Sequence, residues 1–188
     1  MEKFLAVLGI LVLIGAIIFG WYRRGYDRAV MLDERVKSGW SQVENQLQRR
    51  NDLIPNLVNT VKGFAAQEKN ILTEVTRLRS QWGEARTVEE KMDNANQLTG
   101  ALSRLLLVSE NYPELKSNEN FLALQSQLEG TENRISVERM RYNQAVQDFN
   151  SFSRSFFGRI FISGAGITQP AVYFKAAEGT QQVPQVSF

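Results

Sequence analysis

Residues 4–22 read FLAVLGILVLIGAIIFGWY, a stretch of 19 residues without a charged side chain. As a helix it would be about 28 Å long at 1.5 Å per residue, close to the ~30 Å hydrocarbon core of a bilayer. Trp21 and Tyr22 stand where an aromatic belt is expected, and Arg23 and Arg24 follow at once. The sequence therefore predicts one transmembrane helix at 4–22, after a short flank at 1–3.

A cleaved signal peptide is the alternative interpretation of this apolar segment. The leader Met1-Glu2-Lys3 is only weakly basic, and no A-x-A-like pair of small residues follows the apolar run. We therefore expect a retained anchor, with the lipid bilayer as its first partner. The arginines after the helix outweigh Lys3 before it, so the positive-inside rule places the N-terminus outside and the following chain in the cytoplasm.

The chain that follows has the apolar period of a long amphipathic helix. Val36, Trp40, Val43 and Leu47 are separated by four, three and four residues, which places them on one buried face. Pro55 lies further along this stripe and is expected to bend the helix rather than end it. With Gly25 as the only breaker after the apolar run, the two helical segments can form a near-continuous rod.

Three further helices are predicted before residue 158. One spans Glu68–Trp82. Thr87 and Glu90 form a capping-box pattern at the start of the next helix, which Pro113 stops. Asn118 is the expected cap of the last and longest helix.

The predicted fold class is all-α. Each helix exposes an apolar stripe that needs a partner, and short connections favour a long antiparallel bundle with coiled-coil-like packing. This bundle domain is assigned to 23–157.

A different composition begins at residue 158, where glycine and proline become frequent and two β-like runs occur, at 159–162 and 171–174. The segment 158–188 is predicted to be a short β-like C-terminal tail. A lone ribbon is marginal in water, so it should find a partner: the bundle, the membrane surface or another copy. The candidate contacts for a homo-oligomer are Phe161, Tyr173, Phe174, Val186 and Phe188.

The inventory of chemical groups argues against an enzyme. The chain contains no cysteine and no histidine, and its net charge of +2 does not point to nucleic acid. Glu89 and Glu90 do not share a helix face, and the Gly164–Gly166 run lacks the lysine of a phosphate-binding loop. We expect no catalytic residue, cofactor, metal or small-molecule substrate. An enzyme that acts through carboxylates is the remaining alternative.

Two charged runs are candidates for contact between helices. Arg49 or Arg50 can meet Glu132 across the bundle as a partly buried ion pair, which would set helix register. Partner binding and catalysis are the alternatives. The residues assigned to register or partner contacts are Arg49, Arg50, Asp52, Glu132, Asn133 and Arg134.

The end of the last helix is rich in aromatic residues. These side chains could pack in the core, or they could form an exposed patch that docks another chain or lies on lipid. The residues are Tyr142, Phe149, Phe152, Phe156 and Phe157.

Several blocks of the sequence, in order, resemble the LemA family. They are WSQVE (40–44), QLQRRNDLIPNLV (46–58), VKGFA (61–65), YPELK (112–116), NF (120–121), TENRI (131–135), RYN (141–143) and FN (149–150). Pro170, Tyr173 and Phe174 also correspond, whereas 161–166 replaces the tripeptide Phe-Gly-Phe of the family, so the local turn there departs from its pattern. The resemblance implies a bacterial single-pass membrane protein with an outward N-terminus, a cytoplasmic helical body, and no established enzymatic activity or cofactor. It also implies genes beside a membrane metalloprotease of the heat-shock type, and relatives in membrane-organelle assembly.

Together these features predict a non-catalytic scaffold of the bacterial cytoplasmic (inner) membrane that associates with itself. The alternatives are an accessory or regulatory subunit of a membrane metalloprotease and a membrane-remodelling protein.

Overall fold

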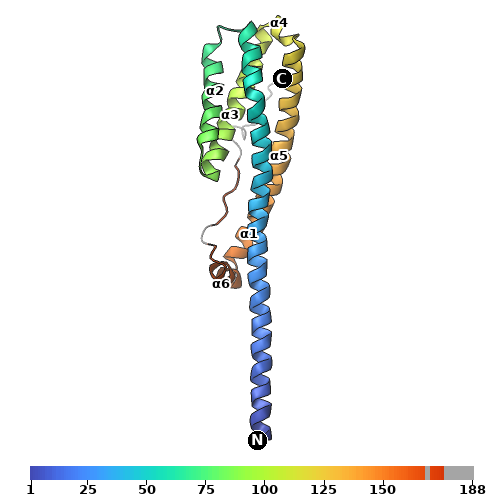
Figure 1. Cartoon of the computed structure of the whole chain (residues 1–188), viewed down its shortest axis with the longest axis vertical. Coiled ribbons are helices and arrows are strands. Elements are labelled where there is room, and N and C mark those ends of the chain that lie inside the picture. Colours follow the sequence, from blue (N-terminus) through green and yellow to red (C-terminus); the bar gives the residue numbers. More distant parts are fainter. Residues whose placement is uncertain (168–169, 176–188) are drawn as a thin grey trace, which may run out of the picture. The chain divides into compact units, whose positions relative to one another are not determined.

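The computed structural model describes residues 1–167 and 170–175, and within these ranges every regular element is a helix. The predicted all-α class is confirmed (Figure 1). The elements are α1 (Glu2–Phe64), α2 (Lys69–Glu84), α3 (Val88–Val108), the 3₁₀ turn η1 (Ser109–Asn111), α4 (Pro113–Lys116), α5 (Glu119–Arg154) and α6 (Phe156–Gly164). Their described residues form two compact units: the first comprises 1–40, 141–167 and 170–172, and the second comprises 41–140 and 173–175.

Helix α1 joins the apolar segment to the amphipathic one without a break. Every residue from Phe4 to Phe19 is exposed, whereas the later part of the helix supplies buried side chains. Within the described ranges, α1 is the one helix that is long and apolar enough to cross a membrane. The near-continuous rod that the sequence permits is therefore present.

Pro55 lies inside α1, and the helix continues through it as predicted. A proline has no N–H, so the carbonyl oxygen of Asn51, four residues earlier, loses its helical donor. Arg79 of α2 replaces that donor, with its Nε 3.2 Å from the Asn51 oxygen. Pro55 thus creates a docking point for the neighbouring helix.

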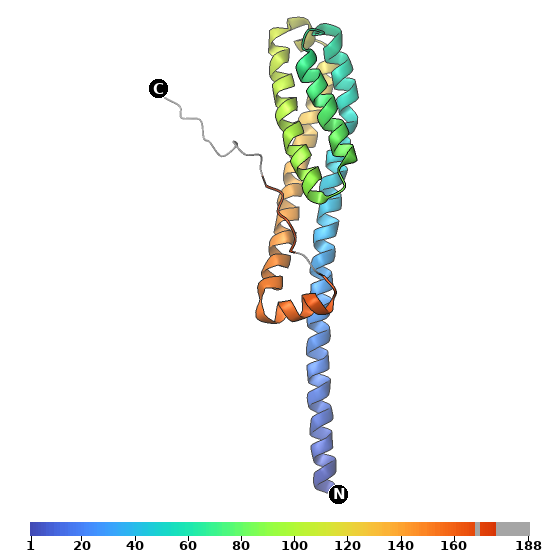
Figure 2. The ribbon, with the colours of Figure 1, turned by 90° about the vertical axis from the view of Figure 1, so that its left-hand side faces the viewer.

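The second unit has a continuous hydrophobic core. Its members come from α1, α2, α3, α4 and α5 and from the connection after α1, and Figures 1 and 2 show the long helices of this unit lying along one another. Two helix starts predicted from sequence are confirmed: Thr87 and Glu90 form a complete capping box, and Asn118 Oδ1 accepts a hydrogen bond from the Phe121 N–H at 3.0 Å. The core residues are Ile54, Leu57, Val61, Ala65, Leu72, Val75, Leu78, Leu98, Ala101, Leu102, Leu105, Leu115, Phe121, Leu124 and Leu128.

The first unit contains the first part of α1, the last part of α5 and α6. Trp40 of α1 packs edge-on against Tyr142 of α5, with ring centroids 5.7 Å apart. Val146 and Phe149 continue this buried face of α5, and Phe161 of α6 is also buried.

One sequence prediction is wrong. The run 159–162 is helical and lies inside α6, rather than forming part of a β-like tail. The reason is local: α5 ends at Arg154, and the Ser155 side chain accepts a hydrogen bond from the Gly158 N–H at 3.1 Å, which caps a new helix. Burial of Phe161 then outweighs the β preference of the isoleucines. The second run, 171–174, has no helical or strand assignment.

Candidate functional site

Arg50 is the one charged residue that is buried in the described part of the chain. It follows Leu47 by three residues and precedes Ile54 by four, so the apolar stripe of α1 carries it into the interior. Only 2% of the residue is exposed. A buried cation is costly unless it is paired and hydrogen-bonded, so the groups around it determine whether the site is stable.

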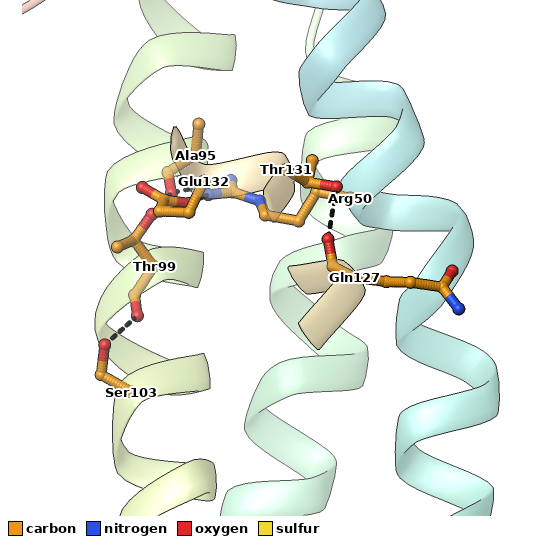
Figure 3. Close-up of polar contacts among 7 residues, drawn as sticks. All are labelled: Arg50, Ala95, Thr99, Ser103, Gln127, Thr131 and Glu132. Carbon is orange, nitrogen blue, oxygen red and sulfur yellow. Dashed lines mark hydrogen bonds and ion pairs between the residues drawn. The ribbon is translucent and has the colours of Figure 1, made fainter. Parts of the chain in front are cut away.

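Three groups accept hydrogen bonds from the Arg50 guanidinium (Figure 3). Nη1 donates to Thr99 Oγ1 at 2.7 Å and to Glu132 Oε2 at 3.1 Å, and Nη2 donates to the Ala95 carbonyl oxygen at 3.0 Å. The arginine enters from α1, Ala95 and Thr99 belong to α3, and Glu132 belongs to α5. One side chain therefore links three helices of the second unit.

The electrostatics of this Arg50 network are asymmetric. Burial lowers the pKa of Arg50 from its usual value, and the charge and hydrogen bond of Glu132 oppose that shift. Guanidinium groups nevertheless keep their proton in proteins. The Glu132 side chain is 42% exposed, so it remains partly hydrated while Arg50 is not. Loss of Glu132 would therefore leave Arg50 as an uncompensated buried charge, whereas loss of Arg50 would leave a carboxylate that water can solvate.

A second arginine, Arg139 of α5, also interacts electrostatically with the Glu132 carboxylate. Burial lowers the pKa of Arg139, and Glu132 opposes this shift as well. The Arg139 guanidinium lies 4.3 Å from the centroid of the Phe174 ring and donates to the Lys175 carbonyl oxygen at 3.1 Å. Asn96 Nδ2 donates to the same oxygen at 3.2 Å. Asn96 of α3 and Arg139 of α5 thus hold the end of residues 170–175, a segment that is neither helix nor strand and is called the extended segment below.

Asn150 and Tyr142 hold the preceding residues in the first unit. The Asn150 amide makes two hydrogen bonds with Ala171: Nδ2 donates to the Ala171 oxygen at 2.9 Å, and Oδ1 accepts from the Ala171 N–H at 3.1 Å. The Tyr142 hydroxyl donates to the Val172 oxygen at 2.8 Å. We call these three bonds the Asn150 clasp. It was not predicted from the sequence, although an asparagine in the interior of a long predicted helix is a usable signal, because asparagine is a poor helix former.

The structure brings only two of the six predicted register residues together. Arg50 pairs with Glu132. The other four are exposed, and Asp52 accepts a hydrogen bond from Gln48 on its own helix. Those four residues are Arg49, Asp52, Asn133 and Arg134.

The predicted oligomer contacts need correction at two positions. Phe161 and Phe174 are buried by contacts within the chain, so their rings are not presented to another copy, whereas Tyr173 is exposed. Val186 and Phe188 lie outside the described residues. The aromatic end of α5 divides between the two interpretations: Tyr142 and Phe149 are buried and Phe152 is partly buried, whereas Phe156 and Phe157 are exposed on α6.

The Arg50 network joins three helices, and the space beside it is small. A small cavity of about 130 Å³ adjoins Arg50 and Glu132, which is below the usual volume of a ligand pocket. The described residues contain no group of three or more carboxylate side chains placed to hold a metal ion. The Arg50 Nη atoms, which would contact an anionic ligand, already donate to acceptors within the chain.

Comparison with known proteins places these residues in a family. The profile of the LemA family matches residues 39–188. This range includes Arg50, Glu132, Asn150 and the segment 170–175. This chain belongs to the LemA family.

Relatives of this LemA-family chain have two kinds of name. It is 23% identical over 182 residues to the protein LemA of Metamycoplasma hominis, a match that covers 94% of this chain and 80% of the relative. It is 27% identical over 151 residues to the magnetosome protein MamQ 2 of Paramagnetospirillum magneticum, covering 66% of this chain. The magnetosome protein MamQ of Magnetospirillum gryphiswaldense is 25% identical over 151 residues. The match spans 56% of the length of both magnetosome relatives.

Proposed function

We propose that this LemA-family protein is a non-catalytic scaffold, anchored in the bacterial cytoplasmic membrane by a single span, that binds other copies of itself. The observation that carries the proposal is the continuity of α1. One helix has an exposed apolar surface at 4–19 and then supplies core residues and Arg50 from 40 onward. An apolar surface of that length is stable in lipid rather than in water.

The body of such a scaffold would be an antiparallel bundle. Short connections, at 65–68 and 85–87, reverse the chain between α1, α2 and α3, as expected of neighbouring antiparallel helices. The ion pairs between helices support this arrangement: Arg50 with Glu132, Lys91 with Glu44, and Arg104 with Glu74. The names of the magnetosome relatives support a location at a membrane.

Self-association is tested by the mass of the protein in detergent. Multi-angle light scattering of the full chain should give a multiple of the 21.4 kDa protomer after subtraction of the detergent. A chain ending at Lys175 lacks Val186 and Phe188 but keeps the Asn150 clasp, so it tests those two predicted contacts without disturbing the described fold. A monomeric full chain in mild detergent and in native nanodiscs would overturn self-association.

A second candidate function is an accessory subunit of a membrane protease. It is favoured by an open groove of about 620 Å³ between α1 and α2, in which Leu72 and Val58 lie beside Lys62, Lys69 and Arg77. Such a groove suits an acidic, partly apolar segment of a partner protein. Native membranes should then yield a protease at fixed stoichiometry with the full chain but not with K62E/K69E. The variant K116E, altered at an exposed lysine elsewhere, is the control.

A further inference from the structure

Helix α6 lies across α1 rather than beside it. Figure 2 shows its axis crossing that of α1, and Figure 1 shows the same helix nearly end-on. The contact is made by Phe161, whose ring centroid is 5.0 Å from that of Trp21 and 5.7 Å from that of Tyr22. A Cβ on Gly25 would lie 2.3 Å from this ring, so the glycine provides the space for it. Helix α6 is thereby fixed at the residues where the apolar segment 4–22 ends.

The face of α6 next to Phe161 is apolar and largely exposed. Phe156 is 80% exposed, Phe157 is 52% exposed and Ile160 is 48% exposed. At 100° per residue these three side chains lie within an arc of about 100°, with Arg159 outside it. Phe157 also contacts Trp21 edge-on, at 5.1 Å between centroids. The exposed face of α6 is therefore continuous with the surface of the apolar segment.

We propose that α6 is an interfacial helix, which inserts Phe156, Phe157 and Ile160 into the headgroup–acyl boundary of the bilayer that α1 crosses. This inference rests on the proposed function, because the crossing of α1 sets the depth of α6. If residues 4–22 span the hydrocarbon, Trp21 and Tyr22 lie at its boundary, and α6 is packed on both of them. A helix axis that runs across the span then lies in the plane of the membrane surface.

The side chains around α6 fit lipid better than a second copy of the chain. Arg23, Arg24 and Arg28 follow the apolar segment, and Arg159 lies at the edge of the exposed face of α6. Aromatic rings that enter the acyl boundary beside cations at headgroup level are the pattern of helices that bind anionic membranes. The Arg28 guanidinium also lies 5.1 Å from the centroid of the Phe152 ring, which keeps it on the same side as the end of α5.

Nitroxide accessibility tests the proposal in the full chain, which has no native cysteine to label. The single-cysteine variants F156C and I160C lie on the apolar face of α6, and R159C lies beside it. Q147C, at an exposed position of α5, and L11C, in the apolar segment, are the references for water and lipid. Each is spin-labelled in vesicles of phosphatidylethanolamine and phosphatidylglycerol. Collision rates are then measured with oxygen, which concentrates in lipid, and with a neutral nickel chelate, which stays in water.

The proposal expects the ratio of oxygen to nickel collisions at 156 and 160 to rise well above that at 147 and 159, toward the value at 11. High nickel accessibility at 156 and 160, with a lipid-like label at 11, would overturn the interfacial helix and leave the span intact. Low accessibility to both reagents would indicate a protein contact, such as a second copy, and would also overturn it. A water-exposed label at 11 would overturn the span itself and, with it, the depth of α6.

Discussion

Glu132 and Arg50 should respond unequally to substitution, because only the arginine is fully removed from water. The change Glu132→Gln leaves a buried cation without its counter-charge, and we expect it to lower the free energy of unfolding by about 2 kcal/mol. Arg50→Met leaves a partly exposed carboxylate that water can solvate, while Thr99 Oγ1 keeps its hydrogen bond to the Ala95 oxygen at 3.0 Å. Its cost should be smaller.

A double-mutant cycle measured by denaturant unfolding checks this prediction. In R50M/E132Q the stranded charge is gone, so the double variant should be more stable than E132Q alone. E129Q is the control, since Glu129 is exposed one turn earlier and bonds only Gln125 of its own helix. Additive losses, or a larger loss for R50M than for E132Q, would contradict the asymmetry.

Pro55 and Arg79 form a second coupled pair. Arg79→Met should cost about 1–2 kcal/mol, because the buried Asn51 carbonyl oxygen then loses its only side-chain donor. Pro55→Ala restores the N–H that a helix would use for that oxygen. The loss caused by R79M should therefore shrink in the P55A background.

The matched control for this pair is Arg77→Met. Arg77 is exposed and bonds only Gln81 on its own helix, so its loss should have little effect in either background. If R79M lowers the free energy of unfolding equally in the wild-type and P55A backgrounds, the hydrogen bond from Arg79 to the Asn51 oxygen does not account for the stabilisation.

The sequence predicted an ion pair with Glu132 but did not decide between Arg49 and Arg50, and it grouped Arg50 with the polar face of its helix. In the structure Arg50 is buried, three residues after Leu47 and four before Ile54. The bonds to Thr99 and to the Ala95 oxygen depend on the axial register of α3, which hydrophobic periodicity does not fix. The four other predicted residues belong to the same two charged runs but lie outside the buried faces of their helices, so they are exposed to water. They are Arg49, Asp52, Asn133 and Arg134.

At the scale of a helix, the start of α3 has a defined dependence on pH. Hydrogen bonds from the backbone N–H groups of Arg86 and Thr87 lower the pKa of Glu90 below its ordinary value of 4.5. A carboxylate whose pKa is lowered by folding stabilises the folded state above its unfolded pKa, and this contribution is lost as the pH falls through the folded value. The midpoint of thermal unfolding should therefore decline below about pH 4.5.

The variant Glu90→Gln isolates that contribution, because glutamine keeps the capping geometry without the charge. It should melt about 1–2 °C below wild type at neutral pH, and the difference should vanish once the wild-type carboxyl is protonated. E89Q is the control and should keep the wild-type dependence. A difference between E90Q and wild type that is constant with pH would rule out the charge as its cause.

The Asn150 clasp should control the access of proteases to the extended segment. Asn150→Ala removes two hydrogen bonds to Ala171, and we expect trypsin to cleave after Lys175 about tenfold faster than in wild type. Q147A, at an exposed position one turn earlier, should leave the rate unchanged. Mass spectrometry of timed digests measures both, and equal rates for N150A and wild type would refute the clasp.

Element prediction failed where a helix cap and one tertiary contact decide between two structures. The run 159–162 has β-type composition, and the hydrogen bond between Ser155 and Gly158, together with the burial of Phe161, favours a helix. Ser155 follows a helix of 36 residues and offers no periodic signal of its own. By contrast, the capping box at Thr87 and the cap at Asn118 were predictable, because each pattern is local in sequence.

At the scale of the whole chain, the predicted orientation can be tested in intact cells. The variant K3C should react with a membrane-impermeant maleimide from outside, whereas S80C, at an exposed position of α2, should react only after permeabilisation. Labelling of S80C in intact cells, with K3C protected, would reverse the orientation that the three arginines favour.

The all-α class followed from the sequence, because the apolar length of 4–22 and the apolar period after it both indicate helix. The sequence permitted the two segments to join into one helix but did not show that they do. The division into two compact units did not follow from the sequence. The unit boundaries, at 40–41 and 140–141, fall inside α1 and α5, where neither a turn nor a change of composition marks them.

The Asn150 clasp has a consequence for proteostasis. An extended peptide with free backbone groups is a template for amyloid-like growth, because a foreign strand can pair with it. The Asn150 amide occupies both the N–H and the carbonyl of Ala171, and the Tyr142 hydroxyl occupies the carbonyl of Val172. Two side chains thus shield Ala171 and Val172 from cross-β nucleation. Loss of Asn150 would free the N–H and the carbonyl of Ala171 for such pairing.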